Sequence, residues 1–169
     1  VYTTDSVMGY EATYGWGWSP KWWNRSLFLR DLTLGRIHYR REGGHAAALT
    51  NSGAGVWKRS PTEGIEVVAQ GTDWRLVDRF GGTIETYNSK GFLTKLDHSD
   101  GLSFALQYST AATPAAIAPR PDLLIGVVGG DGRALSMTYD SAGRLQNVAV
   151  AGSGAIAAAW TRLRTGARS

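Results

Sequence analysis

The sequence contains no cysteine, which excludes disulfide bonds and thiol catalysis. Charged residues are also few: they make up 19% of the 169 residues, below the usual quarter, and the net charge is only +4. Because the arginines are scattered along the chain, the charge pattern does not favour nucleic-acid binding. The longest apolar runs, such as "LLIGVVGG" at 123–130, are too short to span a bilayer. We therefore expect a globular protein with no nucleic-acid partner and no membrane span.

Amphipathic helices are scarce as well, and a two-residue alternation of apolar and polar side chains takes their place. In "LSFALQY" at 102–108 the leucines, Phe104 and Tyr108 share one face, and "LSMTY" at 135–139 repeats the pattern. A period of two is typical of half-buried strands, so we expect an all-β fold. Further strands are expected at 26–32, 36–41, 55–59, 65–69, 74–78, 83–87, 92–97, 123–128, 145–150 and 155–160.

Glycine is abundant where proline is not: the chain has 22 Gly and 5 Pro. Gly-Gly pairs at 43–44, 81–82 and 129–130, and Asp-Gly pairs at 100–101 and 131–132, separate the expected strands. An Asp-Gly pair between strands predicts a tight turn, since both turn positions tolerate a positive φ. Many short antiparallel hairpins are the expected result.

One turn pattern occurs twice, as "YNSKGFL" at 87–93 and "YDSAGRL" at 139–145. The glycine of each suits a left-handed position, and the Asn or Asp after the tyrosine can hydrogen-bond the turn backbone. The tyrosine would anchor one strand end and the leucine would start the next strand. We therefore predict that the motif generates hairpins and is not catalytic. Its members are Gly82, Tyr87, Asn88, Gly91, Leu93, Gly101, Tyr108, Gly132, Tyr139, Asp140, Gly143 and Leu145, with a weaker copy from Gly154 to Trp160.

The segment "DGRALSMTYDSAGRL" at 131–145 closely resembles the YD repeat of Rhs proteins. Residues 81–109 resemble the preceding units, and "YGWGWSPKWWNRSL" at 14–27 resembles the "GxGW" segment that stands just before the repeats in those proteins. Tyr87 is followed by Asn88 and Tyr108 by Ser109, so only Tyr139 carries Tyr-Asp, and 109–121 looks like an insertion. The chain departs from the family pattern in these two respects. The resemblance runs over residues 10 to 150.

This resemblance implies a structural protein. Antiparallel YD-repeat hairpins would form a curved sheet, part of a spiral β-shell or barrel-like cocoon that encloses or presents a toxin cargo for interbacterial delivery. The implied partners are the rest of the shell, the cargo protein or another copy of the chain. The implied location is outside the bacterial cell or in a delivery pathway, although no signal peptide is visible.

The chain divides into five expected parts, and its start at Val1 without a methionine suggests a trimmed fragment or a processed product. The segment 109–121 is rich in alanine and proline, and Pro114 argues against a helix at 111–117. The parts are a Trp-rich plug at 1–30, hairpins with the first YD-like units at 31–108, a linker or loop at 109–121, a further repeat at 122–160 and a basic tail at 161–169.

Four tryptophans lie close together near the start: Trp16, Trp18, Trp22 and Trp23. One interpretation is a plug that caps the end of the sheet with a large apolar area. The alternative is a stacking surface, which would make the chain an aromatic-rich glycan- or protein-binding β module. Both interpretations stay open at this point.

The charged and polar groups do not form a convincing reactive site. His98 with Asp97 or Asp100 could supply a base and its orienting group, but Asp and Ser populate turns for conformational reasons alone. A small basic stripe near Lys58 and Arg59 is interpreted as a solvated strand face; its members are Arg36, Arg40 and Arg41. His38, between Arg36 and Arg40, is expected to face solvent. We therefore expect no enzyme activity, no catalytic residues, no cofactor and no metal.

Overall fold

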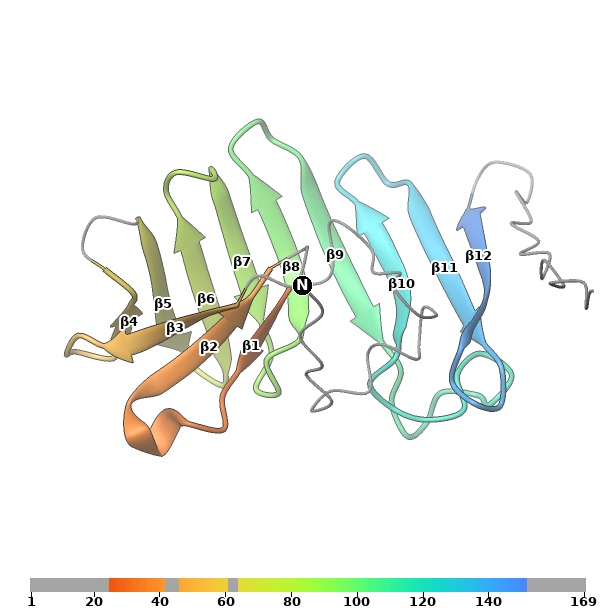
Figure 1. Cartoon of the computed structure of the whole chain (residues 1–169). Helices are drawn as coiled ribbons and strands as arrows, with labels where there is room; N and C mark the ends of the chain where they lie inside the picture. The colour runs from red at the N-terminus through yellow and green to blue at the C-terminus, as the bar shows by residue number, and fades with distance from the viewer. Residues whose placement is uncertain (1–24, 42–45, 61–63, 152–169) are drawn as a thin grey trace, which may run out of the picture.

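The computed structural model describes residues 25–41, 46–60 and 64–151 (Figure 1). They form one antiparallel sheet in which every strand pairs with the next in chain order, so the all-β prediction is confirmed. The only helical segment in these ranges is a 3₁₀ turn, η1 (Leu32–Leu34), and no helix in them is long and apolar enough to cross a membrane. The strands are β1 (Ser26–Phe28), β2 (Arg36–Arg40), β3 (Ala46–Asn51), β4 (Val56–Lys58), β5 (Ile65–Gln70), β6 (Asp73–Asp78), β7 (Thr83–Tyr87), β8 (Leu93–His98), β9 (Ser103–Tyr108), β10 (Leu124–Gly129), β11 (Ala134–Tyr139) and β12 (Leu145–Ala151).

Two strand predictions were wrong in detail. β3 was not predicted, because its sequence "AAALTN" is rich in alanine, which has a weak strand preference. It is a strand because it pairs with β2 along most of its length. The strand expected at 26–32 stops at Phe28, since the chain turns through η1 and leaves it at Gly35, whose φ is 69°. The strand expected at 155–160 lies outside the described residues.

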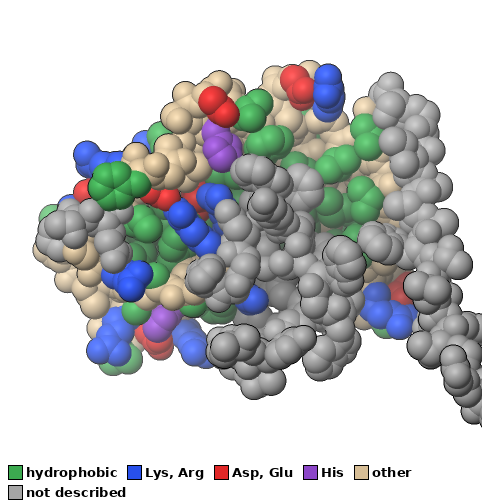
Figure 2. All heavy atoms as spheres, turned by 45° about the horizontal axis from the view of Figure 1, so that its top comes forward, with side chains coloured by type: hydrophobic (Ala, Val, Ile, Leu, Met, Phe, Trp, Pro, Cys, Tyr) green, Lys and Arg blue, Asp and Glu red, His purple; other side chains and the backbone are tan. Residues whose placement is uncertain are grey.

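The two faces of the sheet differ in character. Ile37, Leu49, Val67, Leu76 and Leu96 are 0% exposed and follow one another across the paired strands. Residues between them in sequence, such as His38 and Glu66, are at least partly exposed and lie on the other face. Hydrophobic side chains accordingly gather across the middle of the molecule in Figure 2. The two-residue alternation in the sequence thus produces one apolar face and one polar face.

The sheet is open and not strongly curled, so the described residues do not show the closed, barrel-like form. β1 and β12 stand at opposite ends of the strand order. The first strands nevertheless turn back in front of the middle of the sheet (Figure 1). The Leu27 amide donates to the carbonyl of Gly91 at 2.9 Å, and Ser26 forms a bridge with Phe92. The edge of β1 is therefore held against the turn between β7 and β8.

The segment 109–121 is a folded loop within a hairpin, because β9 and β10 pair with each other on either side of it. The Ser109 hydroxyl donates to the Arg120 carbonyl at 2.8 Å and accepts from the Leu123 amide at 2.9 Å. The Tyr139 amide donates to the Ile117 carbonyl at 2.9 Å, which ties the loop to the end of β11. The loop closes on itself, so it does not separate two independent units.

Candidate functional site

The two copies of the YD pattern form the same turn. Asn88 accepts from the amides of Lys90 and Phe92 at 3.0 Å each, and Asp140 accepts from the amides of Ala142 and Arg144 at 3.0 and 2.9 Å. Gly91 and Gly143 have φ values of 83° and 76°. Each tyrosine stands at a register shift and is opposite the leucine, Tyr87 to Leu93 and Tyr139 to Leu145. The short polar residue and the glycine thus have the same roles in both turns.

The Asp-Gly pairs form the predicted turns between strands, but only the glycine of each pair is left-handed. Gly101 and Gly132 have φ values of 89° and 83°, whereas Asp100 and Asp131 do not have positive φ. Each Asp instead accepts a hydrogen bond from the amide after the glycine, Leu102 at 3.0 Å in the first turn. One left-handed residue is enough because the turn spans three residues, closed by the His98 amide donating to the Leu102 carbonyl at 2.8 Å. Gly82, at the turn before β7, also has a positive φ, of 62°.

The tyrosines of the motif are buried to different extents. Tyr87 and Tyr139 are 0% and 2% exposed. The Tyr139 hydroxyl donates to the Leu124 carbonyl at 2.5 Å, which links β11 to β10. Tyr108 is half-buried and its ring stacks on that of Phe92, with centroids 5.2 Å apart. The hydroxyl of Tyr87 reaches a charged group.

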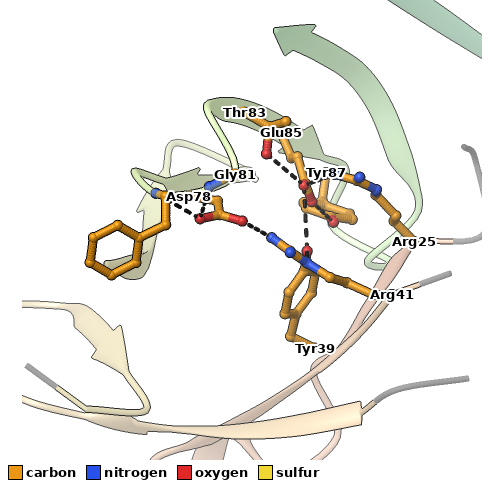
Figure 3. A network of polar contacts seen from close by, with 9 residues as sticks. Arg25, Tyr39, Arg41, Asp78, Gly81, Thr83, Glu85 and Tyr87 are labelled. Carbon is orange, nitrogen blue, oxygen red and sulfur yellow. Dashed lines mark hydrogen bonds and ion pairs between the residues drawn. The ribbon is translucent and has the colours of Figure 1, made fainter. Parts of the chain in front are cut away.

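That group is Glu85, a carboxylate with 0% exposure in the middle of the sheet (Figure 3). The Arg25 guanidinium and the Tyr87 hydroxyl both donate to it. The hydroxyls of Thr83 and Tyr39 add donors at 3.1 and 3.4 Å. Arg25 precedes β1 and Tyr39 lies in β2, so this one carboxylate joins the folded-back strands to β7.

A second ion pair continues the network. Asp78, at the end of β6 and 3% exposed, accepts from the Arg41 guanidinium. It also accepts from the amides of Gly81 and Phe80 at 2.8 and 3.1 Å, which shapes the turn into β7. Arg41 donates to the Tyr39 hydroxyl as well, so the two carboxylates are connected through one arginine and one tyrosine. The placing of Arg41 on a solvated face was therefore wrong, because its guanidinium turns to the buried Asp78.

Burial changes the proton affinities in this network. Burial and then the charge of Glu85 raise the pKa of the Tyr39 hydroxyl above its usual value. The same causes, joined by Tyr39, raise the pKa of Tyr87 well above it. Burial alone would raise the pKa of Asp78, but the hydrogen bonds from Arg41 and from the turn amides outweigh burial and lower it. The network therefore keeps both tyrosines neutral and favours the ionised form of Asp78.

We expect the protein to lose stability steeply in alkaline solution. Unfolded tyrosines release their protons near pH 10, whereas the raised pKa values keep Tyr39 and Tyr87 protonated in the folded state. The stability that these two protonated tyrosines contribute is fully present below about pH 10 and is lost as the pH rises towards their folded pKa values. Over that range the free energy of unfolding falls by about 1.4 kcal/mol per pH unit for each tyrosine. Urea unfolding at a series of pH values from neutral to alkaline measures this slope.

Tyr39→Phe and Tyr87→Phe are the matched variants for this measurement. Each variant is expected to reduce the slope of the unfolding free energy against pH by the part that its own tyrosine contributes, because phenylalanine does not titrate. If both variants kept the slope of the wild type, the tyrosines would not be its source.

The residues considered for catalysis lie at the end of β8, with Asp97 and His98, and in the turn after it, with Asp100. Asp97 pairs with Lys95 at 2.9 Å, and Asp100 caps its turn through the Leu102 amide. No group of three or more His, Cys, Asp or Glu suited to a metal occurs in the described part of the chain. The cluster Trp16, Trp18, Trp22 and Trp23 lies outside the described residues.

The buried network was not predicted from the sequence, although one signal was present. In "TIETY" at 83–87, Glu85 has the same strand phase as Tyr87, a residue assigned to a strand end. Two-residue alternation therefore placed the glutamate on the apolar face. What the sequence could not indicate was the partner, because Arg25 lies 60 residues away.

A comparison of the chain with models of known protein families found no match. A search among curated proteins found no similar protein either.

Proposed function

We propose that the chain is a structural part of an Rhs-type shell that encloses or presents a toxin cargo for interbacterial delivery. The observation that carries the proposal is the pair of YD-type hairpins with the same hydrogen bonds, set in a sheet whose strands follow chain order. Such a sheet grows by adding hairpins of one kind, which is how a shell wall is extended. In this proposal the curvature that the resemblance implies belongs to the larger assembly.

The buried network supports a structural role rather than an enzymatic one. A catalytic group must meet a substrate, whereas Glu85 is 0% exposed and surrounded by donors from the protein itself. Asp78 likewise accepts a hydrogen bond from the Gly81 amide, which stabilises the turn between β6 and β7. Both buried carboxylates therefore stabilise the fold of the described residues.

The end of the sheet supports the same proposal. β12 pairs with β11 on one side, and no described strand pairs with its other side. An edge strand with unsatisfied backbone groups tends to pair with a further strand. A shell segment needs such an edge, because its neighbours in the wall complete it.

We expect the chain to associate as its concentration rises, and analytical ultracentrifugation across a wide concentration range measures this. Placing lysines on the edge, as Ala149→Lys with Ala151→Lys, should keep the protein monomeric, because edge lysines prevent strand pairing. Ala105→Lys is a matched control on the same face of the central strand β9 and should associate as the wild type does. A sharply melting wild type that stays monomeric at every concentration would remove the main physical support of the proposal.

The alternative, a glycan-binding module, is tested on the same sample. A saturable blue shift of tryptophan fluorescence on titration with soluble polysaccharides would favour that function over a scaffold. A scaffold is expected to show no such change.

A further inference from the structure

The connection between β9 and β10 contains a third turn of the YD type. In each of the three turns the amide of a short polar residue donates to a carbonyl at the far end: Asn88 to Phe92 at 2.9 Å, Ser109 to Leu123 at 2.8 Å and Asp140 to Arg144 at 2.9 Å. The side chain of the polar residue accepts from the amide of the same partner, at 3.0, 2.9 and 2.9 Å. In all three the preceding tyrosine stands opposite a leucine at a register shift, and Tyr108 faces Leu124. Ser109 is therefore the counterpart of Asn88 and Asp140.

Asp122 stands where the other two turns have glycine. Its amide donates to the Ser109 carbonyl at 2.9 Å, as the amides of Gly91 and Gly143 donate to their own polar residues at 2.8 Å. Its φ is 68°, in the left-handed region that both glycines occupy and that few other residues adopt. The polar residue and its partner are 14 positions apart in this turn and 4 apart in the other two. The middle turn thus has the ordinary YD frame with ten additional residues inside it.

Residues 110–121, which we call the insert, contact the turns on both sides. Next to the insert, the Lys90 ammonium of the first YD turn lies 2.9 Å from both carboxylate oxygens of Asp122. Within it, the Ile117 carbonyl accepts from the Tyr139 amide at 2.9 Å, and Arg120 is the nearest group to the Gly143 position. Figure 1 shows the insert running along the lower end of the sheet towards the turn between β11 and β12. The insert therefore connects the middle turn to the second YD turn.

The pairing of β11 explains why this contact matters. β10 pairs with β11 from Gly126 to Val128, and in the described chain this pairing stops at Ser136, before Tyr139 is reached. β7, by contrast, pairs with β6 as far as its own tyrosine, Tyr87. A backbone amide that leaves water needs an acceptor, and the Ile117 carbonyl supplies one where β10 has ended. The insert thus replaces the missing end of β10 as the neighbour of β11.

We propose that the insert is a brace for the hairpin β11–β12: the middle turn forms without it, and its contacts hold the lower end of β11 to the sheet. Within the described residues, β11 is the only strand that joins β12 to the sheet, so the hairpin depends on how firmly β11 is held. In the shell, the brace would keep the β12 edge in place for a further strand. That consequence rests on the proposed function, whereas the brace itself does not.

The test is an excision variant in which Ser-Lys replaces residues 110–121 and Asp122→Gly is added, which restores the spacing of the first YD turn. Native-state hydrogen exchange, followed by mass spectrometry of peptides, compares it with the wild type. We expect the amides of β6 and β7 to exchange within about twofold of the wild-type rate. Those of β11 and β12 should exchange about tenfold faster, the effect of contacts equivalent to one net hydrogen bond.

Lys90→Ala is the control for the charge pair that the excision also removes. The side chains of Lys90 and Asp122 are 60% and 38% exposed, so losing their pair should leave the exchange of β11 within about twofold. Unchanged exchange of β11 and β12 in the excision variant would overturn the brace. Equal acceleration in β6 and β7, or loss of the fold, would also overturn it, because the whole sheet would then require the insert.

Two point variants test the third turn in the full-length chain. Asp122→Gly and Asp122→Ala both remove the pair with Lys90, but only glycine adopts the left-handed conformation without strain. We expect Asp122→Gly to melt about 3 °C higher than Asp122→Ala. Equal melting temperatures would overturn the assignment of a YD frame to this turn. Failure of the proposed function would appear instead in the association of the wild type, which neither measurement uses.

Discussion

Replacing Glu85 with alanine is expected to lower the free energy of unfolding by about 3–5 kcal/mol, the usual cost of removing one partner from a buried ion pair. The Arg25 side chain is only 5% exposed and would lose its counter-charge. The hydroxyls of Tyr87 and Thr83 would lose their acceptor as well. Urea unfolding at neutral pH, followed by tryptophan fluorescence, measures the loss.

Glu66→Ala is the matched control, because Glu66 is also a strand glutamate with a basic partner, Lys58 at 2.9 Å. Its side chain is 28% exposed, so its removal should cost less than about 1 kcal/mol. The double variant Arg25→Met with Glu85→Gln should recover part of the stability that Glu85→Ala loses, since no uncompensated charge remains. A loss for Glu85→Ala no larger than that of the control would show that the network does not hold the fold together.

The second large effect is expected at Gly91. A Cβ atom at this position would lie 1.9 Å from the Leu27 carbonyl oxygen, and the φ of 83° already disfavours any side chain. We expect Gly91→Ala to cost about 3 kcal/mol or more, the sum of the left-handed strain and a displaced backbone. Thermal and urea unfolding measure this cost.

Gly143→Ala separates the two contributions. Gly143 has nearly the same φ, 76°, in the same kind of turn, but its nearest neighbour is the Arg120 side chain at 3.1 Å, which can move aside. Its substitution should cost about 1 kcal/mol, the strain alone. Equal losses at the two glycines would mean that the contact between β1 and the turn does not contribute.

The turns were the most predictable part of the protein, because their information is local. Asn88 and Asp140 hydrogen-bond amides two and four residues further along the chain, and Gly91 and Gly143 provide a conformation that other residues avoid. A short sequence window contains every group involved. For the same reason the strands that alternate strictly, such as β9 and β11, were placed well.

β3 shows the opposite case. Its alanines carry almost no strand preference, and the segment is extended because β2 pairs with it from Arg36 to Arg40. The loop at 109–121 also needed the tertiary structure: its sequence suits a linker as well as a loop, and the Tyr139 amide decides between them by binding the Ile117 carbonyl.

The sequence by itself determined that this chain is a series of antiparallel hairpins with one apolar face, since alternation and turn glycines act over a few residues. Only the tertiary structure decided that the first strands turn back over the middle of the sheet and bury Glu85. The groups that meet there come from positions 60 and 46 residues apart, Arg25 and Tyr39 against Glu85. The reason is physical: local preferences set the backbone angles of each hairpin, whereas a buried charge needs a partner that only the folded chain can bring to it.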